Sequence, residues 1–216
     1  MKQTTKELIQ RCFILFIGLT VIAFGVVFSI KAGLGTSPIA SVPYVINQIT
    51  PLSVGTATII MHCTFIFLQI LLLRKQYELF QLLQLPAVIV FGYMTDLAIY
   101  LLRNMECHSY IQQWLFCFVG IVLIAIGVSL EVTANVVTLA AEGLILAICK
   151  VFSFKFGNMK TIFDVSLVCI SIALSLIFLK DLVGVREGTV AAAFLVGILV
   201  KQVNKPLKKV TLIRAH

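Results

Sequence analysis

Six apolar runs, each long enough to cross a lipid bilayer, constrain this sequence more than any other feature. They cover residues 12–31, 54–74, 79–101, 111–131, 157–180 and 188–204. A hydrocarbon core about 30 Å thick needs roughly 20 helical residues, because each adds about 1.5 Å. The chain is 60% apolar and only 12% charged, and 216 residues cannot hide that much apolar surface from water. We therefore expect an all-α integral membrane protein with six transmembrane helices.

Two shorter apolar segments, 36–49 and 135–150, lie between these runs. As a helix the first would reach only about 20 Å, and Pro38 and Pro43 interrupt it. We expect both segments to form short broken or re-entrant helices. The sequence leaves open whether either one crosses the membrane.

Basic residues indicate the orientation. If both short segments re-enter, one side carries Lys2, Lys6, Arg11, Arg74, Lys75, Lys150, Lys155, Lys160, Lys201, Lys205, Lys208, Lys209 and Arg214, and the other carries Lys31, Arg103, Lys180 and Arg186. If both cross fully, the division is slightly less uneven. Because lysine and arginine collect in cytoplasmic loops, we expect six spans with both termini cytoplasmic. The same bias explains the net charge of +8, so we expect no nucleic-acid partner.

The sequence aligns with itself, without a gap, when it is shifted by 102 residues. FGVVFSIKAGLGTSPIASVPYVI then falls on IGVSLEVTANVVTLAAEGLILAI, and three glycines keep one register: Gly18 with Gly120, Gly25 with Gly127, and Gly55 with Gly157. This divides the chain into repeat 1 (1–104), repeat 2 (105–204) and a basic cytoplasmic tail (205–216). Each repeat has three spans and one short segment, so the second must be inverted relative to the first.

Inverted repeats with broken helices at their interface recur in secondary transporters. Irregular backbone at membrane depth is tolerated where it is buried in protein or lines a cavity. The short segments are therefore predicted to line a central cavity. The alternative is that they are connectors packed at the interface and that the repeat serves folding alone.

Charged residues within apolar runs are costly, so each needs a reason. Glu142, in LAAEGLIL, has apolar neighbours on both sides. Lys160 and Asp164 stand four residues apart and share one helical face. We expect these three residues to form a polar cluster that binds substrate, although an ion pair alone would also explain Lys160 and Asp164.

Further residues are candidates for substrate binding or proton transfer, and each also has a structural explanation. Substrate binding is also predicted for Thr36, Ser37, Pro38, Asn135, Arg186, Glu187 and Thr189, and a proton relay for His62, Asp96, Glu142 and Asp164. Arg186 and Thr189 stand where the sixth span begins, and a helix N-terminus can hold an anion, but a capped helix with an exposed ion pair explains them too. His62 equally suits packing, Thr36–Pro38 suits a turn, and Glu131 is expected to face lipid headgroups.

Other chemistry has little support in the sequence. The six cysteines form no CxxC pair, and most lie in apolar runs, where they suit packing. We expect no metal site and no cofactor. There is no HExxH, GxSxG or P-loop, so we expect no enzyme.

The segments LGTSPIASVPYVI, LQILLLR, FGYMTD, TANVVTLAAEG, FGNMKTIFDVS and GVREGTVAAAFLVG together resemble the YczE/YyaS/YitT family of bacterial membrane proteins. The resemblance extends over nearly the whole chain. Some relatives read SPWD where this chain has Ser37-Pro38-Ile39-Ala40, so a site that uses that aspartate is not carried over. The resemblance implies a multi-span protein of the bacterial cytoplasmic membrane and a transporter, without naming a substrate.

Three functions follow from these observations. The first is a small-solute secondary transporter that binds between the repeats and is coupled to protons through a carboxylate. The second is a substrate-binding membrane subunit energised by a separate partner. The third is a regulator or scaffold that transports nothing. The expected partners are the lipid bilayer and an unknown small solute, and homo-oligomerisation stays open.

Overall fold

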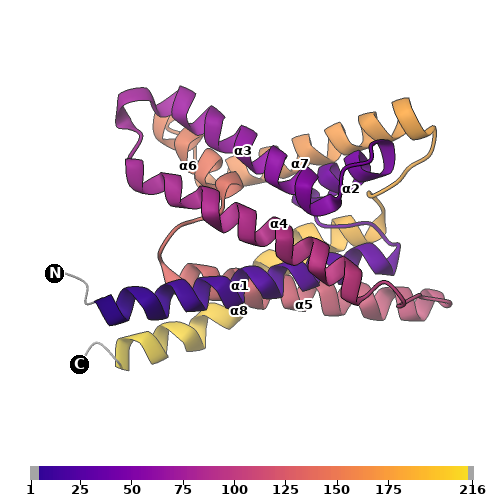
Figure 1. The fold of residues 1–216 in the computed structure, drawn as a ribbon, viewed down its shortest axis with the longest axis horizontal. Helices are drawn as coiled ribbons and strands as arrows, with labels where there is room; N and C mark the ends of the chain where they lie inside the picture. Colours follow the sequence, from indigo (N-terminus) through magenta and orange to yellow (C-terminus); the bar gives the residue numbers. More distant parts are fainter. Residues whose placement is uncertain (1–4, 214–216) are drawn as a thin grey trace.

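The protein is a bundle of helices in the computed structural model, which describes residues 5–213 and the side chains of 6–204. This part of the chain contains no strand. Its α-helices are α1 (Thr5–Ala32), α2 (Pro38–Ile49), α3 (Val54–Leu73), α4 (Gln84–Leu101), α5 (Tyr110–Ala134), α6 (Ala140–Phe152), α7 (Phe156–Leu174) and α8 (Glu187–Ile213). The start of α1 and the end of α8 lie at the same end of the bundle (Figure 1).

Five helices are long and apolar enough to cross a membrane, in agreement with the first five predicted spans. These stretches are Lys6–Ala32, Val54–Gln76, Leu79–Leu101, Tyr110–Ala134 and Phe156–Leu179. The predicted sixth span forms the first part of α8, which is not among the five found in the described part of the chain. The predicted tail continues α8 to Ile213, and its side chains and residues 214–216 lie outside the described part.

Both predicted short segments contain a short helix. The 12 residues of α2 and the 13 of α6 would extend only about 18–20 Å, less than the thickness of a bilayer core. Pro38 opens α2, where a missing N–H costs nothing, and Pro43 lies inside it. The helix α6 begins five residues later than the predicted segment, because Asn135 takes a left-handed conformation (φ 47°) and ends α5. In Figure 1, α2 and α6 lie toward opposite ends of the bundle.

The helices α1 and α5 pack antiparallel through glycines. A Cβ on Gly18 would lie 3.0 Å from the Gly127 carbonyl oxygen, and one on Gly25 would lie 2.8 Å from that of Gly120. Glycine lets two helix backbones approach this closely, as is common between helices in membranes. The glycines that share a register in the sequence repeat therefore meet across the contact between α1 and α5.

The remaining helices pack around this pair. Contacts join α1 with α4, α5 with α8, α2 with α7, α3 with α6, α2 with α3, and α6 with α7. The helices α3 and α4 touch at Gly55, whose Cβ position is only 2.1 Å from the Gly92 carbonyl oxygen. The helices α7 and α8 make no comparable contact within the described residues, and the Cβ positions of Gly157 and Gly197 face open space.

The loops before α2 and before α8 bind each other, and we call residues 33–36 and 184–189 together the loop clamp. The Thr36 N–H donates to the Gly184 carbonyl (3.0 Å), and the Gly188 N–H donates to the Leu34 carbonyl (2.8 Å). Gly35 has φ +92°, and a Cβ there would collide with the Arg186 backbone nitrogen at 2.5 Å. The LGTS and GVREGT segments therefore hold the end of α1 against the start of α8.

Candidate functional site

A cavity of about 510 Å³ lies between the helices, and all eight α-helices contribute side chains to its wall. We call it the central cavity. Most of its wall is apolar. Its polar residues are Ser37, Thr58, His62, Thr95, Glu131, Glu142, Lys160, Thr161, Asp164 and Lys201. It reaches the exposed residues Phe156 and Lys201, near the start of α7 and in the second half of α8.

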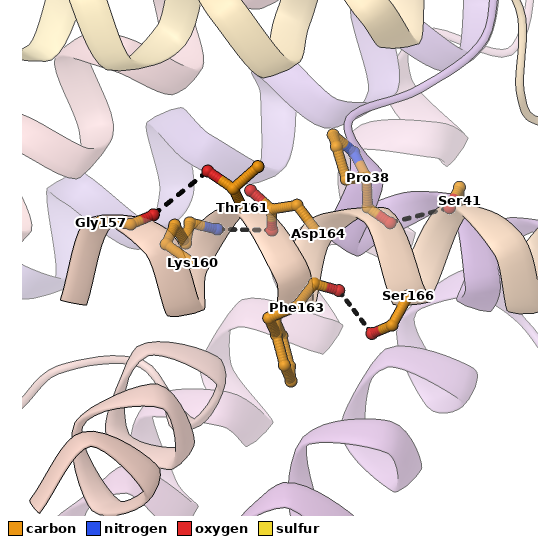
Figure 2. A network of polar contacts seen from close by, with 8 residues as sticks. All are labelled: Pro38, Ser41, Gly157, Lys160, Thr161, Phe163, Asp164 and Ser166. Carbon is orange, nitrogen blue, oxygen red and sulfur yellow. Dashed lines mark hydrogen bonds and ion pairs between the residues drawn. The ribbon is translucent and has the colours of Figure 1, made fainter. Parts of the chain in front are cut away.

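The helix α7 brings an ion pair to this cavity. Lys160 Nζ lies 2.7 Å from Asp164 Oδ1, and the side chains are 35% and 20% exposed. Figure 2 shows Lys160 reaching along α7 toward Asp164, while Phe163 points away on the opposite side. The Thr161 hydroxyl, on the same turn, donates to the Gly157 carbonyl oxygen at 3.1 Å. The predicted pairing of Lys160 with Asp164 is confirmed, and the single positive charge of Lys160 is already engaged.

Glu142 lies in the first turn of α6, half-buried, on the wall of the same cavity. It makes no hydrogen bond or ion pair within the described residues, although the charges of Lys160 and Asp164 reach its carboxylate. Two buried amides position this turn, because Gln69 Nε2 donates to the Ala140 carbonyl (2.8 Å) and to Gln84 Oε1 (3.1 Å). The structure therefore brings Glu142, Lys160 and Asp164 together, as the sequence predicts.

Glu131 is a residue of the central cavity that the sequence did not indicate. It lies in the last turn of α5 and is only 3% exposed, so the expectation that it faces headgroups is wrong. Its Oε1 accepts a hydrogen bond from the Leu139 N–H (2.8 Å), which fixes the start of α6. Its Oε2 is buried and has no partner within the described residues. Glu131 also borders a second cavity of about 380 Å³.

Glu131 had one usable signal in the sequence. It is a lone carboxylate in IGVSLEVTA, nine residues before a short helix whose first N–H groups need acceptors. A carboxylate near a helix N-terminus is favourable for that reason. The sequence could suggest this capping role. It could not show that the second carboxylate oxygen would be buried without a partner.

Three more predicted residues line the central cavity, namely Ser37, Pro38 and His62. His62 is 1% exposed and packs against the rings of Phe65 (5.7 Å) and Phe91 (6.1 Å). His62 therefore packs against aromatic rings, as one of the two interpretations of the sequence predicts. Its Nδ1 is left without a hydrogen bond in the described part of the chain.

Asn135, Asp96 and Thr36 lie elsewhere. Asn135 borders the second cavity. Asp96 accepts hydrogen bonds from the Ser53 hydroxyl (2.6 Å) and the Gly55 N–H (2.8 Å), so it caps α3 and does not line the central cavity. Thr36 is 1% exposed and belongs to the loop clamp.

The predicted anion site at the start of α8 is occupied by the protein itself. Arg186 Nη1 donates to the Gly33 carbonyl at 2.9 Å, and Arg186 Nη2 lies 3.1 Å from Glu187 Oε1. The Thr189 hydroxyl accepts from the Arg186 N–H at 3.3 Å. These three predicted residues hold the loop clamp together. Within the described residues, no group of three or more His, Cys, Asp or Glu side chains could hold a metal ion.

Comparison with known proteins places the chain in a family. Neither the curated proteins nor the solved structures contain a match. The profile of one family matches residues 9–205, which is nearly the whole chain. The description of that family does not mention the YczE/YyaS/YitT family, so the resemblance to the latter stays a prediction. The chain belongs to a family of unknown function, DUF6198.

Proposed function

We propose that this protein is a secondary transporter of a small solute, which binds in the central cavity between two inverted repeats. The observation that carries the proposal is the cavity itself, since every α-helix contributes to its wall and Glu142, Lys160 and Asp164 meet there. Binding pockets for small molecules are mostly apolar, with a few convergent polar groups, and have volumes of about 300–1,000 Å³. A polar cluster needed only for folding would not require such a space.

The packing supports two inverted repeats. Under the shift of 102 residues, the contact of α1 with α4 corresponds to that of α5 with α8, and α2 with α7 corresponds to α6 with α3. The glycine contacts correspond in the same way, since Gly18 meets Gly127 and Gly25 meets Gly120. A pseudo-two-fold axis between α1 and α5 explains these reciprocal pairs.

The two repeats differ at one contact, and that difference suggests how the transporter alternates. In repeat 1, α3 and α4 touch at Gly55; in repeat 2, α7 and α8 are apart, and Gly157 faces open space. The loop clamp directly precedes Ser37, which lines the cavity at one end, whereas the exposed residues Phe156 and Lys201 border it at the other. In the opposite state we expect α7 and α8 to close around Gly157 while the loop clamp and the contact of α3 with α4 open.

The same proposal includes the membrane in which the protein lies and its topology there. We place the protein in the bacterial cytoplasmic membrane, with six spans, both termini cytoplasmic, and α2 and α6 re-entrant. The start of α1 and the end of α8 lie at one end of the bundle, as an even number of crossings requires (Figure 1). After the native cysteines, including Cys107, are replaced, single cysteines in the loops 102–109 and 153–155 test this topology. An impermeant maleimide should label the first loop in intact cells and the second only in inside-out vesicles.

Glu142 is proposed to couple transport to protons. It borders the cavity without a partner of its own, so binding of a proton or of solute would change the charge of the site. Purified protein in liposomes should take up its solute in response to a pH gradient, and Glu142→Gln should abolish that dependence. Glu106→Gln, at an exposed position outside the central cavity, is the matched control.

A solute panel precedes the transport assay. A solute present at 1,000 times its Kd stabilises the protein by about 4 kcal/mol, so its melting temperature should rise. A panel that gives no shift at any pH, together with no uptake by liposomes, would contradict the proposal and favour a regulator or scaffold. Uptake only in the presence of a separate energising protein would instead favour a partner-dependent subunit.

A further inference from the structure

The unpartnered oxygen of Glu131 indicates what kind of solute the central cavity accepts. Glu131 is only 3% exposed, and its Oε2 meets no donor within the described residues. An isolated carboxylate is costly to bury, so it must be neutralised by a proton or paired with a cation. Since Glu131 borders the central cavity, either one can reach it from there.

Among the described residues, none pairs a positive charge with Glu131. The N–H of Leu139, the residue before α6, donates to Oε1, and the charge that acts on Glu131 is that of Glu142, a second carboxylate. On α8, Lys201 is exposed at the edge of the cavity, and α1 contributes only apolar residues there. Across the cavity stand Lys160, Asp164 and His62, and across the second cavity stand Glu78 and Lys150.

The only cation well inside the central cavity is therefore Lys160, among the residues that the structure describes, and it is bound to Asp164 at 2.7 Å. Its charge reaches Glu142, whereas the charge that acts on Glu131 is that of Glu142. The α5–α6 side of the cavity thus presents two carboxyl groups that would repel each other if both were ionised, and no described residue places a positive charge between them. A ligand with one positive charge would relieve that repulsion.

The rest of the wall fits an apolar body. Helices α1, α4, α5 and α8 contribute Ile22, Val26, Phe91, Ile124, Val128 and Val196. The volume of about 510 Å³ suits a molecule of drug-like size. The Phe91 ring adds a surface that attracts cations. A small inorganic ion would leave this apolar wall without a function.

We propose that the central cavity binds an amphipathic organic cation, such as a quaternary ammonium or phosphonium with an apolar body, and that Glu131 together with Glu142 holds its positive charge. The inference rests on the proposed function, because it names the solute class of the same site. When the cavity is empty, a proton neutralises Glu131. Binding of the cation releases that proton, so charge is conserved and the two ligands compete for one carboxylate. Transport is then an exchange of cation for proton.

The test uses the purified full-length protein and two probes of the same shape but opposite charge, tetraphenylphosphonium and tetraphenylborate. Calorimetry at pH 6, 7 and 8 should show saturable binding of the phosphonium, tighter at higher pH, with release of a proton measured from buffers of different ionisation enthalpy. Tetraphenylborate should bind at least tenfold more weakly. Equal binding of both probes would overturn the inference.

Substitutions test which carboxylate holds the positive charge of the phosphonium. Glu131→Gln keeps an amide oxygen for the Leu139 N–H, so it should fold, and it should weaken phosphonium binding at least tenfold and remove its pH dependence. Glu131→Asp should retain the pH dependence, and Glu106→Gln should behave as the wild type. Unchanged binding by a folded Glu131→Gln protein would overturn the inference. If that variant does not fold, the same measurements on Glu131→Asp and Glu142→Gln decide.

The result also separates this inference from the proposed function. If the phosphonium does not bind, but a neutral or anionic solute binds and is taken up by liposomes, the transporter stands and the cation specificity is refuted. If neither probe nor any panel solute binds or is transported, both proposals fail.

Discussion

Gly55 and Gly157 offer a matched test of the packing, because they hold equivalent positions in the two repeats. Each is the second residue of its helix, α3 or α7. A Cβ on Gly55 would lie 2.1 Å from the Gly92 carbonyl oxygen, whereas ordinary contact begins at 3.4 Å, so α4 would have to move. A Cβ on Gly157 meets nothing within 4 Å. The same substitution to alanine should therefore have opposite effects.

The magnitudes follow from overpacking and helix propensity. Extra volume in a packed contact costs about 1–3 kcal/mol, and Gly55→Ala should reach the upper part of that range because the obstacle is backbone. Alanine gains at most about 1 kcal/mol over glycine in a helix, and both variants share that gain. We expect Gly55→Ala to be less stable than Gly157→Ala by about 1–3 kcal/mol, and Gly157→Ala to match or exceed the wild type.

Unfolding in a denaturing detergent, followed by the fluorescence of the single tryptophan, Trp114, measures these free energies. Wild-type protein and both variants are compared in the same micelles, so that detergent effects cancel. Equal stability of the two variants would refute the reasoning, because it would mean that α3 and α4 are no closer at Gly55 than α7 and α8 are at Gly157.

Three further predictions concern residues that hold the site in place. Asp96→Ala removes the acceptor of the Ser53 hydroxyl and the Gly55 N–H at the start of α3, while Ser53 still caps Thr56, and should lower the free energy of unfolding by about 1–2 kcal/mol in the same assay. An unchanged value would mean that the Asp96 bonds contribute nothing. Gln69→Leu leaves the buried Ala140 carbonyl without its donor and should cost about 1–3 kcal/mol; wild-type stability would show that α6 is held by other contacts. Arg186→Ala removes the bond to the Gly33 carbonyl and should increase protease cleavage in the loop clamp, with melting temperature as the control for global unfolding. Cleavage at the wild-type rate would show that the backbone bonds alone hold the clamp.

The sequence by itself determined the helices. The apolar runs place five membrane-length helices within three residues of their observed ends, except that the first begins six residues earlier, at Lys6, because length and hydropathy depend on neighbours along the chain. The pairing of Lys160 with Asp164 follows from the same local geometry, since residues four apart share a helical face. The sequence also shows that glycines recur at equivalent positions of the two repeats, but it does not show which glycine of α5 each glycine of α1 contacts.

Tertiary structure decided which polar groups share a cavity. Glu131, 11 residues before Glu142, borders the same cavity only because α5 ends at Asn135 and the chain turns into α6. Asp96 caps α3 and Arg186 binds the loop before α2, and both partners come from distant parts of the chain. Such contacts depend on how the helices cross. Local sequence patterns do not encode those crossing angles, because they arise when side chains from separate helices pack against one another.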